Sequence, residues 1–235
     1  MEYVLIMIVF LMIVAFFVPK YIRFKGSNYK VVSGNSFLKT IFNKGNYGEF
    51  LTFDLLEKLK GNYYLLTNVY IPKKDGTTTE IDLIMISEFG IYVFESKNYS
   101  GWIFGNEKSR NWTQTLPNKQ KNRFFNPIWQ NNSHIKALSD YIDYHDNSIY
   151  KSYIVFSERC TLKKITVYSP RTKVLKREQL LKNIKKEQKN AVFLLMSDEM
   201  NHFNEMLKPL TKVDEALKKV HVEQVKAKIK NRTEN

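Results

Sequence analysis

Three ionisable residues interrupt two apolar runs in the first half of the sequence. Asp82 lies within residues 79–86, and Glu95 and Lys97 lie near the end of residues 91–97. Both runs are rich in Ile, Val and aromatic residues, and the short connection between them ends in glycine, so they predict an antiparallel β-hairpin. The two-residue period of a strand places Glu95 and Lys97 on one face. Two carboxylates and an ammonium on rigid strands can bind a cation and stabilise developing negative charge.

The charges in this hairpin have two interpretations. Burying a carboxylate costs several kcal/mol unless a cation, a metal or hydrogen bonds compensate it, which favours a functional site. Alternatively, Asp82 lies at a strand end, and Glu95 with Lys97 forms a half-exposed pair worth roughly 0–1 kcal/mol.

A carboxylate also lies at the start of the helix that precedes the hairpin. Residues 46–60 predict a largely buried helix, because apolar residues recur every four positions from Tyr47. Glu49 lies in the first turn, on the row shared with Phe53 and Leu56. That row predicts that Glu49 points towards the sheet. The alternative is that Glu49 only favours the positive end of the helix.

Two further segments follow the hairpin. Residues 119–125 mix Lys, Arg and Phe and predict a basic, aromatic loop that either contacts phosphates and stacks bases or docks its aromatic rings on the core. Pro127 suits the first turn of a helix that continues to about Tyr144. Gln130 lies near the start of this helix, either in the site or on the surface.

Four segments resemble, in order and spacing, the nuclease-related domain (NERD) family within the restriction-endonuclease-like superfamily. Ile81 stands where the superfamily often has Pro, and Ser96 stands where an apolar residue is commoner. Each segment is a weak signal alone, but four in register are specific. The segments are Gly45–Glu49, Glu80–Asp82, Glu95–Asn98 and Asn126–Gln130.

The resemblance implies an α/β fold of the restriction-endonuclease-like type, with a central mixed sheet of about five strands flanked by helices. It also implies a nuclease that hydrolyses phosphodiester bonds with Mg²⁺ or Mn²⁺. Asp82, Glu95 and the Ser96 backbone carbonyl would bind the metal, and Lys97 would orient the attacking water and stabilise negative charge. Glu49 would support the metal or a second ion, and Gln130 would be auxiliary.

Composition agrees with an anionic partner. The 235 residues carry a formal net charge of +14, which favours nucleic acid, with DNA expected, or a membrane surface. The single cysteine, Cys160, cannot form an intrachain disulfide, and the four histidines lack zinc-site spacing and are expected at surface or partly buried positions. The sequence has neither a Walker A motif nor a glycine-rich dinucleotide-binding motif, so we expect activity without a bound nucleotide. A separate helicase could still act as a partner.

The N-terminal segment predicts a transmembrane helix before the α/β fold. Residues 3–18 form an unbroken apolar run, with Tyr21 and Ile22 extending it into the interface. The alternative is a cleavable signal peptide, but a basic region before the run and a small-residue cleavage site are both absent. Basic residues follow the run at once, so the positive-inside rule predicts a single-pass cell-membrane protein with a cytoplasmic C-terminal domain.

These patterns divide the chain into four regions. We expect an anchor at 1–22, a connector at 23–43, the nuclease-related domain with its extension at 44–196, and a basic helical tail at 197–235. The tail either contacts lipid or DNA or is simply a solvated helix. The main alternatives to a nuclease are a catalytically inactive, membrane-tethered nucleic-acid-binding module and a scaffold.

Overall fold

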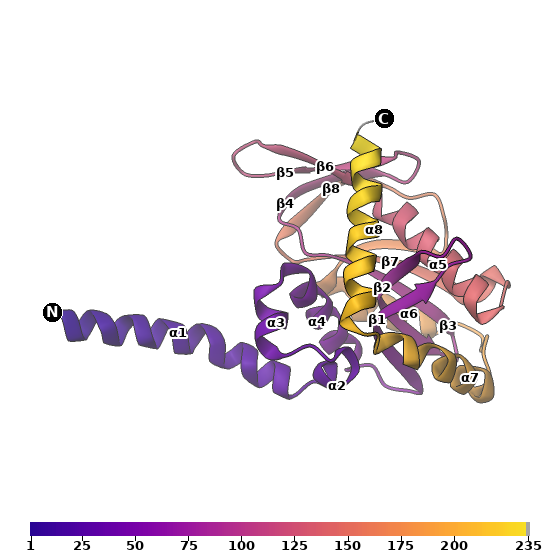
Figure 1. Cartoon of the computed structure of the whole chain (residues 1–235), viewed down its shortest axis with the longest axis horizontal. Coiled ribbons are helices and arrows are strands. Elements are labelled where there is room, and N and C mark those ends of the chain that lie inside the picture. The colour runs from indigo at the N-terminus through magenta and orange to yellow at the C-terminus, as the bar shows by residue number, and fades with distance from the viewer. Residues whose placement is uncertain (234–235) are drawn as a thin grey trace.

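The predicted hairpin lies at the centre of a five-stranded mixed sheet, sheet A, in the computed structural model, which describes residues 1–233. The strand order is β1-β2-β3-β7-β9, and Figure 1 labels the first four of these strands. The first three strands pair antiparallel, whereas β7 and β9 join in parallel. The strands are β1 (Tyr63–Pro72), β2 (Thr78–Ser87), β3 (Gly90–Lys97), β7 (Tyr150–Phe156) and β9 (Thr172–Lys176).

A second sheet, sheet B, has four strands. In the sequence, three of them lie between β3 and β7, and the fourth lies between β7 and β9. Its order is β6-β5-β4-β8, with β8 parallel to β4 and the other pairs antiparallel. The strands are β4 (Gly101–Asn106), β5 (Asn111–Thr115), β6 (Lys121–Phe125) and β8 (Cys160–Thr166). Gly105 is required here, because a Cβ at this position would lie 2.1 Å from the Trp112 ring.

Helices surround sheet A. They are α1 (Glu2–Lys25), α2 (Tyr29–Ser33), α3 (Phe37–Phe42), α4 (Lys44–Leu56), α5 (Pro127–Ile142), α6 (Leu180–Gln188), α7 (Ser197–Leu207) and α8 (Glu215–Thr233), with 3₁₀ turns η1 (Asn147–Ile149), η2 (Arg177–Gln179) and η3 (Lys208–Thr211). Two asparagines fix the starts of the helices that matter for the site. Asn43 Oδ1 accepts from Asn46 N at 3.0 Å, and Asn126 Oδ1 accepts from Ile128 N at 2.9 Å.

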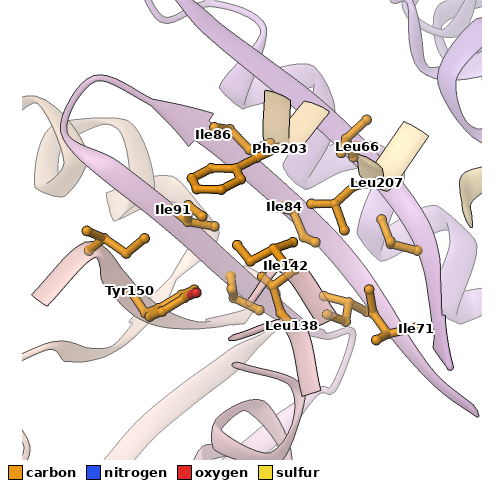
Figure 2. Close-up of a cluster of buried hydrophobic side chains, with 14 of the residues drawn as sticks. Leu66, Ile71, Ile84, Ile86, Ile91, Leu138, Ile142, Tyr150, Phe203 and Leu207 are labelled. Atoms are coloured by element: carbon orange, nitrogen blue, oxygen red, sulfur yellow. The ribbon is translucent and has the colours of Figure 1, made fainter. Parts of the chain in front are cut away.

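Alternation along β2 and β3 supplies two apolar layers, one on each face of sheet A. On one face, Ile84 and Ile91 pack with α5 and α7 (Figure 2). On the other face, Leu83 and Phe94 pack with α4 and α6. Sheet A is therefore covered on both sides, and Asp82, Glu95 and Lys97 lie where the apolar layers end.

The last turn of α1 belongs to the folded domain. Phe24 is 3 % exposed and packs against Phe50 with the ring centroids 5.5 Å apart, and Arg23 Nη2 lies 2.6 Å from Asp54 Oδ2. The apolar part of α1 is largely exposed, and its half-buried Phe17 has its ring centroid 6.0 Å from that of Phe42. Among the described residues, α1 alone is long and apolar enough to be a candidate membrane span. A signal sequence near the N-terminus would have the same length and apolar composition.

The predicted fold class is confirmed: two mixed sheets flanked by helices, preceded by an apolar N-terminal helix. The prediction of a loop over residues 119–125 is wrong, because residues 121–125 form β6. Pairing with β5 decides this, since Phe124 turns inwards onto Trp112 while Lys121 and Arg123 stay exposed. Sheet B as a separate layer and strand β9 were not predicted.

Candidate functional site

Asp82 and Glu95 lie next to each other where the β2–β3 ladder ends. The last paired residues are Leu83 and Phe94. Asp82 directly precedes Leu83 and Glu95 directly follows Phe94, so a carboxylate lies just beyond this pair on each strand. Asp82 Oδ2 accepts a hydrogen bond of 2.8 Å from the backbone N–H of Ser96. Glu95 is 1 % exposed. The hairpin therefore brings together the two carboxylates that the sequence singled out.

Lys97 and Gln130 complete a short polar chain. Lys97 Nζ donates to Glu95 Oε1 at 2.6 Å and to Gln130 Oε1 at 3.1 Å. Gln130 comes from the second turn of α5, which packs across β3. The backbone N–H of Ser157 donates to Lys97 O at 3.0 Å and fixes the end of the strand. Gln130 is thus in the site and not on the surface.

His134 also lies in the site, although it was expected to be an ordinary surface or partly buried histidine. It is 7 % exposed, and its Nε2 lies 3.3 Å from Glu95 Oε2. On the other side of the ring, Nδ1 lies 2.9 Å from Thr79 Oγ1. The signal was present in the sequence, because a residue four positions after Gln130 shares its helix face.

Glu49 approaches from α4, as its apolar row predicted. Its Oε2 is enclosed and has no hydrogen-bond partner among residues 1–227, whose side chains the structure describes. Burial, and then the nearby Glu80 and Glu95 carboxylates, raise the pKa of Glu49 to about 8. Glu49 therefore holds a proton at neutral pH more readily than an exposed carboxyl group.

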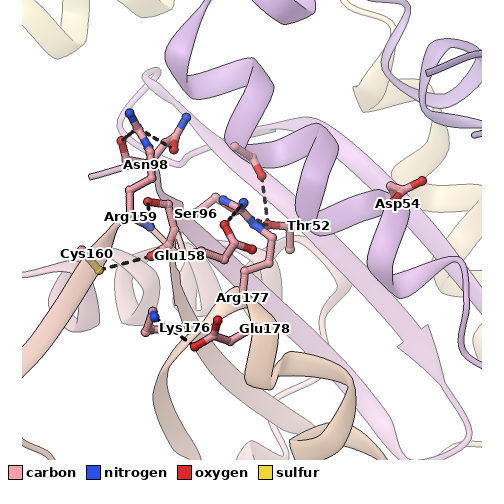
Figure 3. Close-up of polar contacts among 12 residues, drawn as sticks. Thr52, Asp54, Ser96, Asn98, Glu158, Arg159, Cys160, Lys176, Arg177 and Glu178 are labelled. Carbon is pink, nitrogen blue, oxygen red and sulfur yellow. Dashed lines mark hydrogen bonds and ion pairs between the residues drawn. The ribbon is translucent and has the colours of Figure 1, made fainter. Parts of the chain in front are cut away.

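Ser96 turns its side chain to the opposite face, towards α4. Its Oγ lies 3.3 Å from Thr52 Oγ1, which also accepts from Arg177 Nε at 3.3 Å. Arg177 is 1 % exposed, and its Nη1 donates to Glu158 at 2.8 Å (Figure 3). This network supports the end of β3 on the face of sheet A that α4 covers, while the Ser96 backbone N–H donates to Asp82.

Asn98 joins the end of β3 to the start of α4. Its Nδ2 donates to Lys44 O at 2.7 Å, and Arg159 Nη2 donates to its backbone oxygen at 2.9 Å (Figure 3). A Cβ at Gly48 would lie 3.0 Å from Asn98 Cβ, so glycine permits this close approach. The clamp holds the helix turn that carries Glu49 beside the strand that carries Glu95.

The site opens into a cleft of about 500 Å³ between β2, α5 and α8. Asp82, Gln130 and His134 line the inner wall, and His221 of α8 lines the opposite wall. A hydrogen bond joins α8 to the start of β2, because His221 Nδ1 lies 2.9 Å from Thr78 Oγ1. The candidate site is therefore accessible to a ligand.

The carboxylates have opposite electrostatic environments. Burial, and then Glu95 and Glu49, raise the pKa of Asp82 well above its usual value. Burial would also raise the pKa of Glu95, but Lys97 and His134 outweigh it and lower that pKa. Burial would lower the pKa of Lys97, yet Glu95 and Asp82 outweigh it and raise that pKa, so Lys97 remains an ammonium at neutral pH.

The donor set has the chemistry of a hard-cation site. Carboxylate and backbone oxygens are the ligands preferred by Mg²⁺ and Mn²⁺. The pKa values of Asp82 and Glu49 are raised first by burial and then by neighbouring carboxylates, and a cation would relieve both costs. In the part of the chain that the structure describes, no three His, Cys, Asp or Glu side chains are arranged as a metal cluster. Two carboxylates plus the Ser96 carbonyl fit the ion by ligand type.

Comparisons with known proteins identify the family of this chain. A family model described as a nuclease-related domain matches residues 44–157, which include every residue named above from Glu49 to Ser157. The chain is 38 % identical over 180 residues to an uncharacterized protein of Bacillus anthracis, covering 76 % of this chain and 82 % of that protein. No solved structure matches the chain significantly. The chain therefore belongs to the nuclease-related domain (NERD) family, within the restriction-endonuclease-like superfamily.

Proposed function

We propose that this protein is a divalent-metal-dependent nuclease that hydrolyses phosphodiester bonds of nucleic acid, with DNA as the expected substrate. The observation that carries the proposal is that Asp82 and Gln130 line one open cleft, while Lys97 donates hydrogen bonds to Gln130 and to the buried Glu95 directly behind them. Nuclease-like domains of this family generally use divalent metals. The crowded carboxylates support the same requirement.

The proposed mechanism divides the work among the residues of the cleft. Asp82, Glu95 and the Ser96 carbonyl would hold Mg²⁺ or Mn²⁺, and that ion would supply an activated water and neutralise phosphate charge. Lys97 stays protonated and donates to the phosphate oxygen that gains charge. Gln130 holds the Lys97 ammonium in place through its Oε1. Glu49 adds negative charge near the ion when it loses its proton.

We also propose that α1 anchors this nuclease in the cell membrane, with the remaining domain in the cytoplasm. The exposed apolar length of α1 needs a lipid environment, and the cations at Lys20, Arg23 and Lys25 follow it directly. Continuity of α1 into the core at Phe24 favours an anchor over a cleaved leader.

The test is a cleavage panel with the full chain in detergent micelles. Labelled single- and double-stranded DNA and RNA are incubated with Mg²⁺, Mn²⁺ or EDTA. Cleavage is expected with metal only, and Asp82→Asn should abolish it. Asp140→Asn replaces an exposed aspartate on α5 and should leave cleavage unchanged.

Two outcomes would replace the proposal. Nucleic-acid binding without cleavage under every metal condition would identify a tethered binding module. Failure to bind nucleic acid, with binding to anionic lipid through residues outside α1, would identify a scaffold.

His134 should tune metal affinity through Glu95. His134→Ala is expected to weaken Mn²⁺ binding roughly 10- to 100-fold, because Glu95 Oε2 loses the ring that faces it. Isothermal titration of the full chain measures this without turnover. His202→Ala, at an exposed position on α7, is the matched control. Equal affinities for both variants would remove His134 from the site.

A further inference from the structure

The outer face of sheet B carries aromatic rings between cations. We define this outer face by Trp102, Phe104, Lys121, Arg123, Lys163 and Lys164. Trp102 is 50 % exposed and Phe104 is 36 % exposed, whereas their neighbour Ile103 is fully buried. Strand alternation therefore separates a packed inner face from an aromatic outer face.

The strand register arranges these residues in two rows across the sheet. In one row, Lys121 pairs with Thr115, which pairs with Trp102, and Lys163 Nζ lies 4.9 Å from the centre of the Trp102 ring. The other row runs from Arg123 through Thr113 and Phe104 to Lys164. A shift in register between Ile103 and Phe104 lets consecutive lysines of β8 serve both rows. Each row thus has a ring flanked by cations.

The charge of this face is of one sign. The four strands of sheet B contain no Asp or Glu. No carboxylate within residues 1–233 forms an ion pair with the four cations of the outer face. The nearby Glu107 carboxylate is engaged by Ser169 and by the backbone N–H of Tyr168. The face is therefore complementary to a polyanion.

Exposed rings select the form of that polyanion. Unpaired bases stack on aromatic side chains, whereas the ring faces of bases in a duplex are already stacked on one another. Lys and Arg at the ends of each row lie where phosphates would pass. An anionic lipid surface would also meet cations and aromatics, but the outer face continues into the cleft. Phe125 ends β6 and lines that cleft, and α5 with Gln130 begins two residues later.

We propose that the outer face of sheet B binds a single-stranded nucleic-acid segment, with bases stacked on Trp102 and Phe104 and phosphates held by the four cations. Binding on this face stands without catalysis. The further step, in which the outer face directs the bound strand into the cleft for cleavage, rests on the proposed nuclease function.

The test measures oligonucleotide binding by the full chain in micelles with EDTA, so that turnover does not interfere. Fluorescence anisotropy compares single-stranded and duplex DNA and single-stranded RNA. The double variant Trp102→Ala/Phe104→Ala is expected to bind single strands at least tenfold more weakly. Phe193→Ala, at an exposed aromatic on the loop between α6 and α7, should change affinity less than twofold.

A second pair of variants tests the cations. Lys121→Ala/Arg123→Ala should weaken binding and reduce the slope of log affinity against log salt by about 1.4, the value for two phosphate contacts to a single strand. Lys185→Ala/Lys186→Ala, which removes two exposed lysines of α6, should not lower affinity as far. Equal losses for both pairs would overturn the proposal in favour of diffuse charge.

Other results would also overturn it. Unchanged affinity in Trp102→Ala/Phe104→Ala, or duplex binding as tight as single-strand binding, would show that the rings do not stack bases. Trp102-dependent association with anionic but not zwitterionic nanodiscs, without oligonucleotide binding, would assign the face to lipid. Normal binding with no cleavage would contradict only the proposed nuclease function.

Discussion

Lys97→Met should lower metal-dependent cleavage by roughly 10²–10³-fold or more, while the protein remains folded. The ammonium donates to Glu95 and Gln130 and keeps its proton at neutral pH, so it acts as a fixed cation and not as a base. Methionine fills the same space without charge. Cleavage rates on the substrate identified by the panel, together with melting curves, measure the effect.

Lys151 offers a matched control for that experiment. It lies on β7, is 9 % exposed, and its Nζ is 2.6 Å from Glu187 Oε1. Lys151→Met therefore removes a similar buried lysine from the same sheet, away from the cleft. We expect it to affect stability but not turnover. Cleavage at the wild-type rate by Lys97→Met, or equal losses in both variants, would remove Lys97 from the proposed chemistry.

Glu49→Gln should stabilise the protein in EDTA at pH 8 but not at pH 5. The pKa of Glu49 is raised to about 8 in the folded chain, so its contribution to stability is complete below about pH 4.5 and is lost as the pH rises through 8. Glutamine has no proton to lose. At about 1.4 kcal/mol per pKa unit, the gain in unfolding free energy reaches at most about 4 kcal/mol at pH 8.

Thermal unfolding of the full chain in micelles at the two pH values measures this difference. Glu223→Gln, at an exposed position of α8, should show no pH-dependent gain. Added Mg²⁺ should reduce the advantage of Glu49→Gln, because a nearby cation favours the carboxylate that glutamine lacks. The same pH dependence in wild type and Glu49→Gln would show that this carboxyl group is not the buried acid responsible.

Local patterns predicted the parts of the site that are local in sequence. The hairpin, and with it Asp82, Glu95 and Lys97, follows from strand alternation around a short turn. The inward direction of Glu49 follows from its helix row. The catalytic, metal-binding and auxiliary roles of these residues, and the regional boundaries at 22, 43 and 196, stay predictions.

Non-local pairing explains what the sequence did not predict. Sheet B depends on β4 joining β8 in parallel across more than 50 residues, and β6 has Lys, Asn and Arg, which are not strong strand formers. The sequence around His221 is that of a polar helix. His221 is buried because α8 docks on β1 and β2, where its ring packs on Tyr70 and its Nδ1 lies 2.9 Å from Thr78 Oγ1. Such contacts leave no periodic signal within either segment.

The position of α8 has a consequence for the order in which the site forms during synthesis. The hairpin with Asp82 and Glu95 emerges from the ribosome early, because it lies in the first half of the chain, and its local pairing needs no later segment. The segments that complete the site emerge more than 100 residues later. Phe203 and Leu207 cover sheet A beside that hairpin, and His221 and Val225 line the cleft. A nascent chain therefore carries its acidic residues long before it has a closed cleft, and translation itself delays completion of the site.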